Sequence, residues 1–264
     1  DDIVGNNSYH VLYAEGNATS DITSACEVNG FYISAGAALG SYPNNIGGGL
    51  YVKGNGAGKE ASPSISNCSF LGNKAYLGGA INFFTNNGGL SSSSITNSSF
   101  SGSLAVTNGG AIHIQSSNAG TLSPSFTDCT FSDNSTSTSG NGGVVYNYAV
   151  DAADVCSPNF TNCSFSENTG FYGAVFYKYL VGTCQSSITN CSFSNNQATS
   201  VGGAIYNITT GTGNSGNLSS SFINCSFSEN SADYEAGAIG NSGVNCLPSF
   251  TNCILWGNYA INSP

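Results

Sequence analysis

The chain has 264 residues and a net charge of -10, and charged residues make up only 7% of it, against roughly 25% in a typical domain. With four lysines and no arginine, it lacks the cations that neutralise phosphates, which excludes nucleic acid and anionic membrane surfaces as partners. No run of about 18 apolar residues occurs, so no segment is expected to insert into a membrane. The hydrophobic share of 39% is still enough to bury a core.

Two features favour an extracellular or cell-surface protein. Ten cysteines suit an oxidising compartment, where disulfides persist. Asn-x-Ser/Thr sequons, the acceptor pattern for N-linked glycans, are numerous, and we expect such glycans, best placed in variable loops. The glycosylation candidates are Asn17, Asn207, Asn217, Asn6, Asn97, Asn134 and Asn159.

Residues 1–25 come first in the chain and contain short strand-like stretches but no repeat. We expect this segment to be extended, and to cap the molecule or to contact another subunit. Repetition begins with a degenerate unit made of Cys26, Val28 and the run GGGLYV at 47–52. Residues 26–264 are therefore predicted to form the repeat domain.

From residue 64 onward, two short blocks alternate along the chain. The first, for example SISNCSFLGN at 64–73, occurs seven times, and its cysteine position steps by 28 to 34 residues. The second, for example VGGAIY at 201–206, follows each of the first six copies. Within the first block, cysteine and phenylalanine alternate with polar residues at the period of two that a strand requires. A bend is expected near Asn67, because the apolar residue before it does not fit this alternation.

Each block is too short to bury its own apolar face, so the repeats must stack on one another. Stacked coils pair every strand with neighbours about 4.8 Å above and below, and glycines in the second block permit sharp turns and close approach. Helical bundles are excluded because no segment shows a period of 3.6. The sequence predicts an all-β, right-handed parallel β-helix (a solenoid) of about seven to eight coils of roughly 31 residues.

Two columns of asparagine recur once per coil. Asparagine tolerates the left-handed backbone of a coil corner, and stacked amides can hydrogen-bond above and below. The predicted inward-pointing ladder comprises Asn67, Asn162, Asn190, Asn224 and Asn252 in one column and Asn73, Asn168, Asn196, Asn230 and Asn258 in the other. Four members of the first column lie in sequons, and because an inward side chain cannot carry a glycan, the ladder is the preferred interpretation.

Most cysteines share one predicted core column. Equivalent Cα atoms in neighbouring coils would lie about 4.8 Å apart, within the range for a disulfide. Bridges such as Cys163–Cys191, or Cys156–Cys163 within one coil, are therefore predicted, and buried thiols that fill the core are the alternative. The disulfide candidates are Cys26, Cys68, Cys129, Cys156, Cys163, Cys184, Cys191, Cys225, Cys246 and Cys253.

No catalytic residue, metal site or cofactor is predicted. Asp151 and Asp154 share a variable loop and are interpreted as solvated, and the histidines His10 and His113 lack partners at catalytic spacing. The cysteine spacing fits no usual pair of zinc ligands. A polysaccharide-active β-helix enzyme and an ice-binding protein with a threonine column are remote alternatives.

The paired motifs F-x-x-N (Phe165 to Asn168) and G-G-A-I (Gly202 to Ile205) resemble the repeats of polymorphic membrane proteins, and the resemblance covers residues 64–258. It implies the β-helical passenger domain of a surface-exposed adhesin, with an extracellular adhesive or surface-coat role. It carries over no catalytic residue.

The ends of the predicted solenoid lead to the functional hypothesis. Unpaired strand edges need a cover, and after Asn258 the sequence shows no amphipathic helix or charged cap. We expect copies of the chain to cover one another head to tail, and such a contact makes a filament when it does not close. The predicted function is a secreted, non-catalytic structural glycoprotein, and a monomeric cell-surface adhesin is the alternative.

Overall fold

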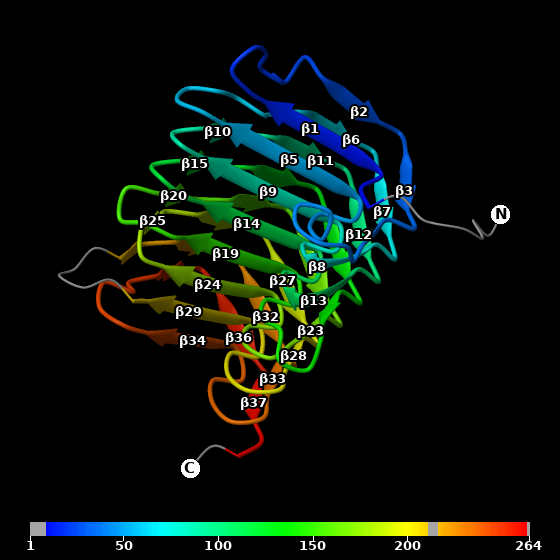
Figure 1. Ribbon diagram of the computed structural model, residues 1–264. Helices are drawn as coiled ribbons and strands as arrows, with labels where there is room; N and C mark the ends of the chain where they lie inside the picture. Colours follow the sequence, from blue (N-terminus) through cyan, green and yellow to red (C-terminus); the bar gives the residue numbers. More distant parts are fainter. Residues whose placement is uncertain (1–8, 211–215, 263–264) are drawn as a thin grey trace.

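A computed structural model describes residues 9–210 and 216–262, and these residues form strands, turns and loops without any helix. The strands stack as a parallel β-solenoid (Figure 1), in which successive coils contribute strands to the same sheets. The predicted all-β parallel solenoid is confirmed, and register partners such as Ile95 and Phe126 lie 31 residues apart. We number the sheets I to V in the order in which a coil visits them.

The first two sheets carry the first repeated block and meet at the outer asparagine column. Sheet I consists of β2 (Glu27–Asn29), β6 (Ser64–Ser66), β11 (Ser94–Thr96), β16 (Ser125–Thr127), β21 (Asn159–Thr161), β26 (Ser187–Thr189), β31 (Ser221–Ile223) and β35 (Ser249–Thr251). Sheet II consists of β3 (Tyr32–Ser34), β7 (Ser69–Leu71), β12 (Ser99–Ser101), β17 (Thr130–Ser132), β22 (Ser164–Ser166), β27 (Ser192–Ser194), β32 (Ser226–Ser228) and β36 (Ile254–Trp256).

The remaining three sheets close each coil. Sheet III consists of β4 (Ala37–Ala38), β8 (Lys74–Leu77), β13 (Leu104–Asn108), β18 (Ser135–Thr136), β23 (Thr169–Gly170), β28 (Gln197–Ala198), β33 (Ser231–Ala232) and β37 (Tyr259–Ala260). Sheet IV, built on the glycine-rich block, consists of β1 (Leu12–Gly16), β5 (Leu50–Asn55), β9 (Ile81–Asn86), β14 (Ile112–Ser116), β19 (Val145–Ala149), β24 (Phe176–Leu180), β29 (Ile205–Thr209) and β34 (Ile239–Ser242). The short sheet V consists of β10 (Leu90–Ser91), β15 (Thr121–Leu122), β20 (Val155–Cys156), β25 (Thr183–Cys184) and β30 (Asn217–Leu218).

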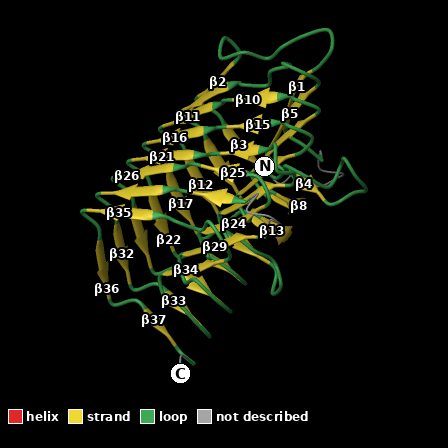
Figure 2. Ribbon diagram, turned by 90° about the vertical axis from the view of Figure 1, so that its left-hand side faces the viewer, coloured by secondary structure: helices red, strands yellow, loops and turns green. Residues whose placement is uncertain are grey.

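The described part of the N-terminal segment belongs to the first coil. Strand β1 pairs in parallel with β5, from Leu12 opposite Leu50 to Gly16 opposite Gly54. Farther along the segment, Ile22 forms a parallel bridge with Ala61. Figures 1 and 2 place this first coil and the last coil at opposite ends of the molecule.

The core is built from columns of identical side chains, one per coil. Phe100, Phe131 and Phe165 stack with nearly parallel rings whose centroids are 4.7 and 4.8 Å apart, and each of them is 0% exposed. Burial of one such ring contributes roughly 1.5–3 kcal/mol, and the stacking adds about 0.5–1.5 kcal/mol more. The phenylalanine of the first block is therefore the main apolar support of each coil.

Three corners of the coil depend on a left-handed backbone, and the one between sheets II and III takes varied residues, such as Gly72 with φ of 62° and Glu167 with φ of 58°. Between sheets I and II the residue is usually asparagine, as at Asn67 with φ of 52°. Between sheets III and IV it is usually glycine, as at Gly142 with φ of 65°. The next residue, Gly143, has no room for a side chain, because a Cβ there would lie 2.3 Å from the backbone oxygens of Ala174 and Thr169. The glycine pair thus lets one coil lie directly on the next.

A buried asparagine column runs through the corner between sheets II and III. Asn168 Oδ1 accepts hydrogen bonds from the backbone N–H and Nδ2 of Asn134 at 3.0 and 3.1 Å. Its Nδ2 donates to the Phe131 carbonyl and to Asn196 Oδ1, each at 3.0 Å, so the polar groups of the amide are satisfied. The predicted inner members Asn73, Asn168, Asn196 and Asn230 are 0% exposed, and Asn258 is half-buried. The column is interrupted at Ser103, whose buried Oγ lacks a hydrogen-bond partner.

Completing this column at Ser103 is expected to stabilise the fold. Ser103→Asn would supply the missing amide and raise the free energy of unfolding by about 1 kcal/mol. Asn168→Ser creates the same gap where the column is intact, and should lower the free energy of unfolding by about 2 kcal/mol. Urea unfolding of both variants measures these two changes in the free energy of unfolding. A loss of stability in Ser103→Asn together with no change in Asn168→Ser would contradict a supporting role for the amides.

Candidate functional site

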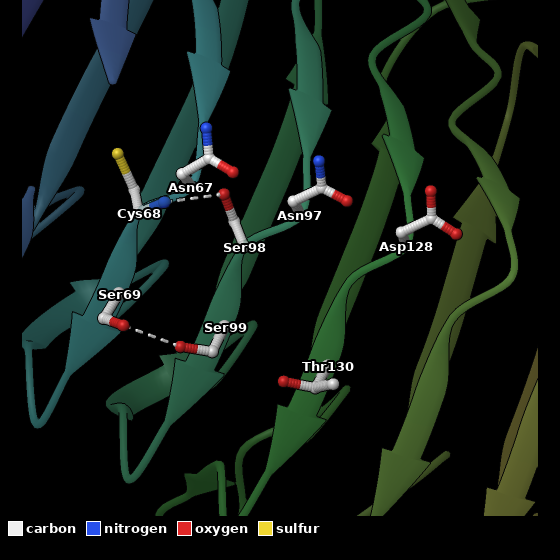
Figure 3. Close-up of a pocket in the computed structure, with 8 residues that line it drawn as sticks. All are labelled: Asn67, Cys68, Ser69, Asn97, Ser98, Ser99, Asp128 and Thr130. Atoms are coloured by element: carbon white, nitrogen blue, oxygen red, sulfur yellow. Dashed lines mark hydrogen bonds between the residues drawn. The ribbon is translucent and has the colours of Figure 1, made fainter. Parts of the chain in front are cut away.

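The corner between sheets I and II forms an open surface depression of about 330 Å³. Figure 3 shows Asn67, Asn97 and Asp128 side by side on successive coils, with their polar groups directed the same way. Below them, the hydroxyls of Ser69 and Ser99 lie 3.0 Å apart. Asp128 is the only charged group in its lining. The depression therefore presents mainly neutral hydrogen-bonding groups to solvent.

The asparagines of this corner form a ladder on the surface. Asn190 Nδ2 donates to Asn162 Oδ1, and Asn224 Nδ2 donates to Asn190 Oδ1, both at 3.1 Å. The five predicted members of this outer column are all exposed, so the expectation that they point inward is wrong. The physical reason is the left-handed corner, where strict alternation breaks: Thr189 and Asn190 both face outward, between the buried Ile188 and Cys191. The cysteine that follows each of four of them is buried, as Cys191 is, and the asparagine before it faces solvent.

The predicted glycosylation sites differ in their access to solvent. Asn134 and Asn207 are 0% exposed, and Asn207 Nδ2 donates to Asn241 Oδ1 at 2.8 Å. A glycan cannot be accommodated at these two positions in this fold, which corrects that expectation. Asn97 and Asn217 are exposed, Asn17 and Asn159 are half-buried, and Asn6 lies outside the described residues.

All ten cysteines are free thiols, so the predicted disulfides do not occur in this structure. The core-facing thiols donate to backbone carbonyls, as Cys163 Sγ does to Thr161 at 3.3 Å and to Phe126 at 3.5 Å. In a parallel ladder the Cα–Cβ bonds of register partners run side by side, so their Cβ atoms stay about 4.8 Å apart. Disulfides need a Cβ separation of roughly 3.5–4.5 Å. The thiols instead fill the core as small apolar groups.

The core-facing side of sheet IV changes from apolar to polar along the solenoid. In register, Val52, Phe83 and Ile114 are followed by Asn147, Lys178 and Asn207. Lys178 is 2% exposed, its Nζ donates to Ser220 Oγ at 2.8 Å, and burial lowers its pKa. Sequence analysis missed this residue, although its position two residues after Phe176 places it on the core-facing side of the strand.

His113 is buried on the opposite face of sheet IV, at 2% exposure. Its ring stacks on Tyr146 with centroids 5.3 Å apart and an interplanar angle of 4°, and Asn82 Nδ2 lies 3.0 Å from its Nδ1. Desolvation lowers the pKa of His113 from 6.5 to about 3. The ring is therefore neutral at physiological pH and serves as part of an aromatic stack.

Acid should destabilise the protein partly through His113. Because its pKa is about 3 when folded and 6.5 when free, the unfolded chain binds an extra proton between these values. The free energy of unfolding should then fall as pH drops from 6.5 to 3, by on the order of 5 kcal/mol. In His113→Tyr this part of the pH dependence should disappear, whereas Gln115→Tyr on the same strand should retain it. Denaturant unfolding across this pH range measures the slopes, and equal slopes in both variants would contradict the assignment.

The two loop aspartates have different surroundings. Asp154 is 0% exposed, and its carboxylate accepts hydrogen bonds from the backbone N–H groups of Asp151 at 2.7 Å and Gly120 at 3.2 Å. The interpretation of Asp154 as solvated is therefore wrong, because its carboxylate organises its own loop, whereas Asp151 is exposed. Among the described residues, no group of three or more His, Cys, Asp or Glu could hold a metal ion.

The C-terminal end of the solenoid exposes the apolar columns of the core. Phe250 and Leu255 are 42% and 55% exposed, whereas their register partners one coil earlier, Phe222 and Phe227, are 0% exposed. With Ile239 they border a hollow of about 390 Å³. In the described part of the chain, the last coil therefore has core side chains like those of an internal coil, and no further coil covers them.

The N-terminal end is also apolar. Phe31 is 59% exposed and Tyr32 84% exposed. Together with Val11 and Val28, they line a hollow of about 280 Å³. Among the described residues, strands β2 and β3 of this first coil each pair on one side only, which leaves one edge of each strand without a described partner.

None of the described residues forms a helix long and apolar enough to cross a membrane. Two segments, residues 128–148 and 190–208, match the family model of the Chlamydia polymorphic membrane protein repeat. These two segments are similar to the polymorphic membrane protein repeat. Each matched segment begins at the outer corner and runs through sheets II and III into sheet IV, so the family motif describes the larger part of one coil. No curated protein and no solved structure matches the chain.

Proposed function

We propose that this chain is a non-catalytic structural protein of the cell surface or extracellular space, and that its copies assemble head to tail into a filament. The observation that carries the proposal is the exposure of core columns at the C-terminal end. Leu255 is 55% exposed where the equivalent Phe227 is 0% exposed. A second copy stacked below would bury these side chains as an internal coil does.

The geometry of the two ends suits a continuous stack. Sheets I to IV each begin with a strand of the first coil, β1 to β4, and end with a strand of the last coil, β34 to β37. All these sheets are parallel throughout, so the first coil of one copy has the strand direction needed to pair with the last coil of another. Such a contact is heterologous and extends without closing.

The surface features support a structural rather than a catalytic role. The outer corner offers mainly neutral amides and hydroxyls to solvent. His113 is buried in an aromatic stack, and the buried Asp154 carboxylate accepts a hydrogen bond from the backbone N–H of Asp151. The repeat family, named for membrane proteins of Chlamydia, supports a location at the cell surface. A monomeric adhesin would share these features and is the alternative outcome of the experiments below.

N-linked glycans are part of the proposal. The accessible sequons are those at Asn217 and Asn97 and, less openly, Asn17 and Asn159. The sequons of the outer corner are also exposed, and there the coil spacing of about 4.8 Å leaves no room for glycans on adjacent coils. Side-facing glycans of this kind would leave both ends of the solenoid free for stacking.

Electron microscopy of the purified protein in negative stain tests the filament directly. We expect fibres of uniform width, and fibres should be lost in Leu255→Asp, which places a charge in the open C-terminal core. The matched control is Leu71→Asp, because Leu71 is 53% exposed on the side of sheet II, and this variant should assemble like the unmodified protein. Discrete short rods from the unmodified protein would contradict the filament and favour the monomeric adhesin.

A mixing experiment distinguishes a specific end contact from general aggregation. Phe31→Asp blocks the N-terminal end and Leu255→Asp blocks the C-terminal end, so each variant keeps one intact end. Each variant alone should remain monomeric, and an equimolar mixture should form dimers and nothing larger, as measured by analytical ultracentrifugation. Fibres in the mixture, or no association at all, would show that these two ends do not recognise each other.

Glycan occupancy is expected to follow exposure. Peptide mapping of protein from its natural source, after enzymatic glycan release in heavy-oxygen water, should mark Asn217 and leave Asn134 and Asn207 unmarked. A glycan at Asn134 would be incompatible with its place in the buried ladder, where Nδ2 donates to Phe100 O at 3.0 Å and to Asn168 Oδ1 at 3.1 Å.

A further inference from the structure

The interior of the C-terminal coils holds an amine and a thiol beside each other. Lys178, on β24, is 2% exposed, and Cys184, on β25 of the same coil, is 0% exposed. Ser220 Oγ accepts a hydrogen bond from Lys178 Nζ at 2.8 Å and lies 3.9 Å from Cys184 Sγ. Asn147, the register partner of Lys178, reaches the same sulfur, with its Nδ2 3.4 Å from Cys184 Sγ. Both reactive groups therefore point into one small polar space.

Within residues 9–210 and 216–262, no carboxylate forms an ion pair with Lys178. The contacts of Cys184 Sγ are Asn147 Nδ2 at 3.4 Å and the hydroxyls of Ser186 and Ser220 at 3.2 and 3.9 Å. Desolvation is the largest influence on Lys178 and lowers its pKa, which increases the fraction of neutral, nucleophilic amine. The amine and the sulfur share Ser220 Oγ as a neighbour, at 2.8 Å from Nζ and 3.9 Å from Sγ.

The thiol of Cys156, in the preceding coil, is less suited than Lys178 to react with Cys184. Cys156 precedes Cys184 in sheet V, as the pairing of Val155 with Thr183 shows. However, Cys156 Sγ donates to the Tyr148 carbonyl at 3.3 Å, and parallel register partners keep their Cβ atoms too far apart for an unstrained disulfide. The lysine amine approaches from another sheet and is free of this restriction.

We propose that Lys178 and Cys184 form a modification site, in which a peroxide converts them into a covalent sulfur–nitrogen cross-link. Hydrogen peroxide first oxidises the Cys184 thiol to a sulfenic acid and is reduced to water. Lys178 Nζ then attacks Sγ, the S–O bond breaks, and the hydroxyl leaves as water with a proton from nitrogen. The product contains two hydrogens fewer than the two free side chains. A thiol reductant cleaves the S–N bond and restores both groups.

The cross-link would join sheets IV and V within one coil. Protonation of a buried amine is costly, and the neutral S–N product keeps the nitrogen uncharged. The proposal concerns the interior of the coil and does not depend on filament assembly or on glycans.

Trypsin gives a direct readout, because cleavage requires a free lysine side chain. The chain has lysines only at 53, 59, 74 and 178 and no arginine, so complete digestion yields the large fragments 75–178 and 179–264. After peroxide treatment, alkylation of free thiols during unfolding, and digestion, we expect an uncut fragment 75–264. Dithiothreitol added before digestion should restore the cut after Lys178. Mass spectrometry of the uncut fragment should show the loss of two hydrogens between Lys178 and Cys184.

Two serine variants make the test specific. Cys184→Ser should be cut after Lys178 with or without peroxide. Cys246→Ser is the matched control, because Cys246 also acts electrostatically on Lys178, and it should gain the same protection as the unmodified protein. Equal cutting of the peroxide-treated and untreated protein would overturn the proposal, as would protection that persists in Cys184→Ser.

Discussion

The repeat of the coil along the solenoid axis is the constraint on which the rest of the structure depends. Parallel pairing fixes this repeat at about 4.8 Å, so every side chain has its own equivalent directly above and below. Phenylalanine rings stack at this distance, with Phe165 and Phe193 4.8 Å apart, and asparagine amides bond to one another, as Asn168 and Asn196 do. Like charges would repel at the same spacing. A charged side chain repeated in every coil would be unfavourable, and charged residues make up only 7% of the chain.

The same constraint explains the ends and the cysteines. A coil is complete only when it has two neighbours, which is why Phe222 is buried and its register partner Phe250 is 42% exposed. Stability in such an array is roughly a sum of coil and interface terms, so an uncovered end coil lacks one interface term. Because the side chains of register partners run parallel, stacked thiols lie near one another, but their Cβ atoms are too far apart for a disulfide. The end coils and the Lys178–Cys184 pair are where this repetition fails.

The regular repeat made the fold predictable from the sequence. Residues that depart from the repeat were the ones whose positions were predicted incorrectly. The alternation of cysteine with Phe165 and the spacing of the blocks predict stacked parallel coils. The outer asparagines were predicted on the wrong side because stacked amides were assumed to require burial, whereas the left-handed bend at Asn67 directs its side chain outward, just before the buried Cys68. Asn207 was treated as a loop residue, although its position two residues after Ile205 places it on the core-facing side of a strand. Sheet V was missed because it lies within the segments of variable length, where two-residue strands leave no pattern.

The polar interior of the C-terminal coils has consequences for how the solenoid would grow. On the core-facing side of sheet IV, the N-terminal coils bury Val52, Phe83 and Ile114, and the later coils bury Asn147, Lys178 and Asn207. Buried polar groups contribute less than apolar ones and cost free energy where they are unsatisfied, as Asn147 Oδ1 and Asn207 Oδ1 are. On this face of sheet IV the later coils therefore gain less from burial than the earlier ones, and the last coil also exposes Phe250 and Leu255. In the proposed filament, a partner stacked on this end would add the missing interface term, and assembly would then stabilise the last coils.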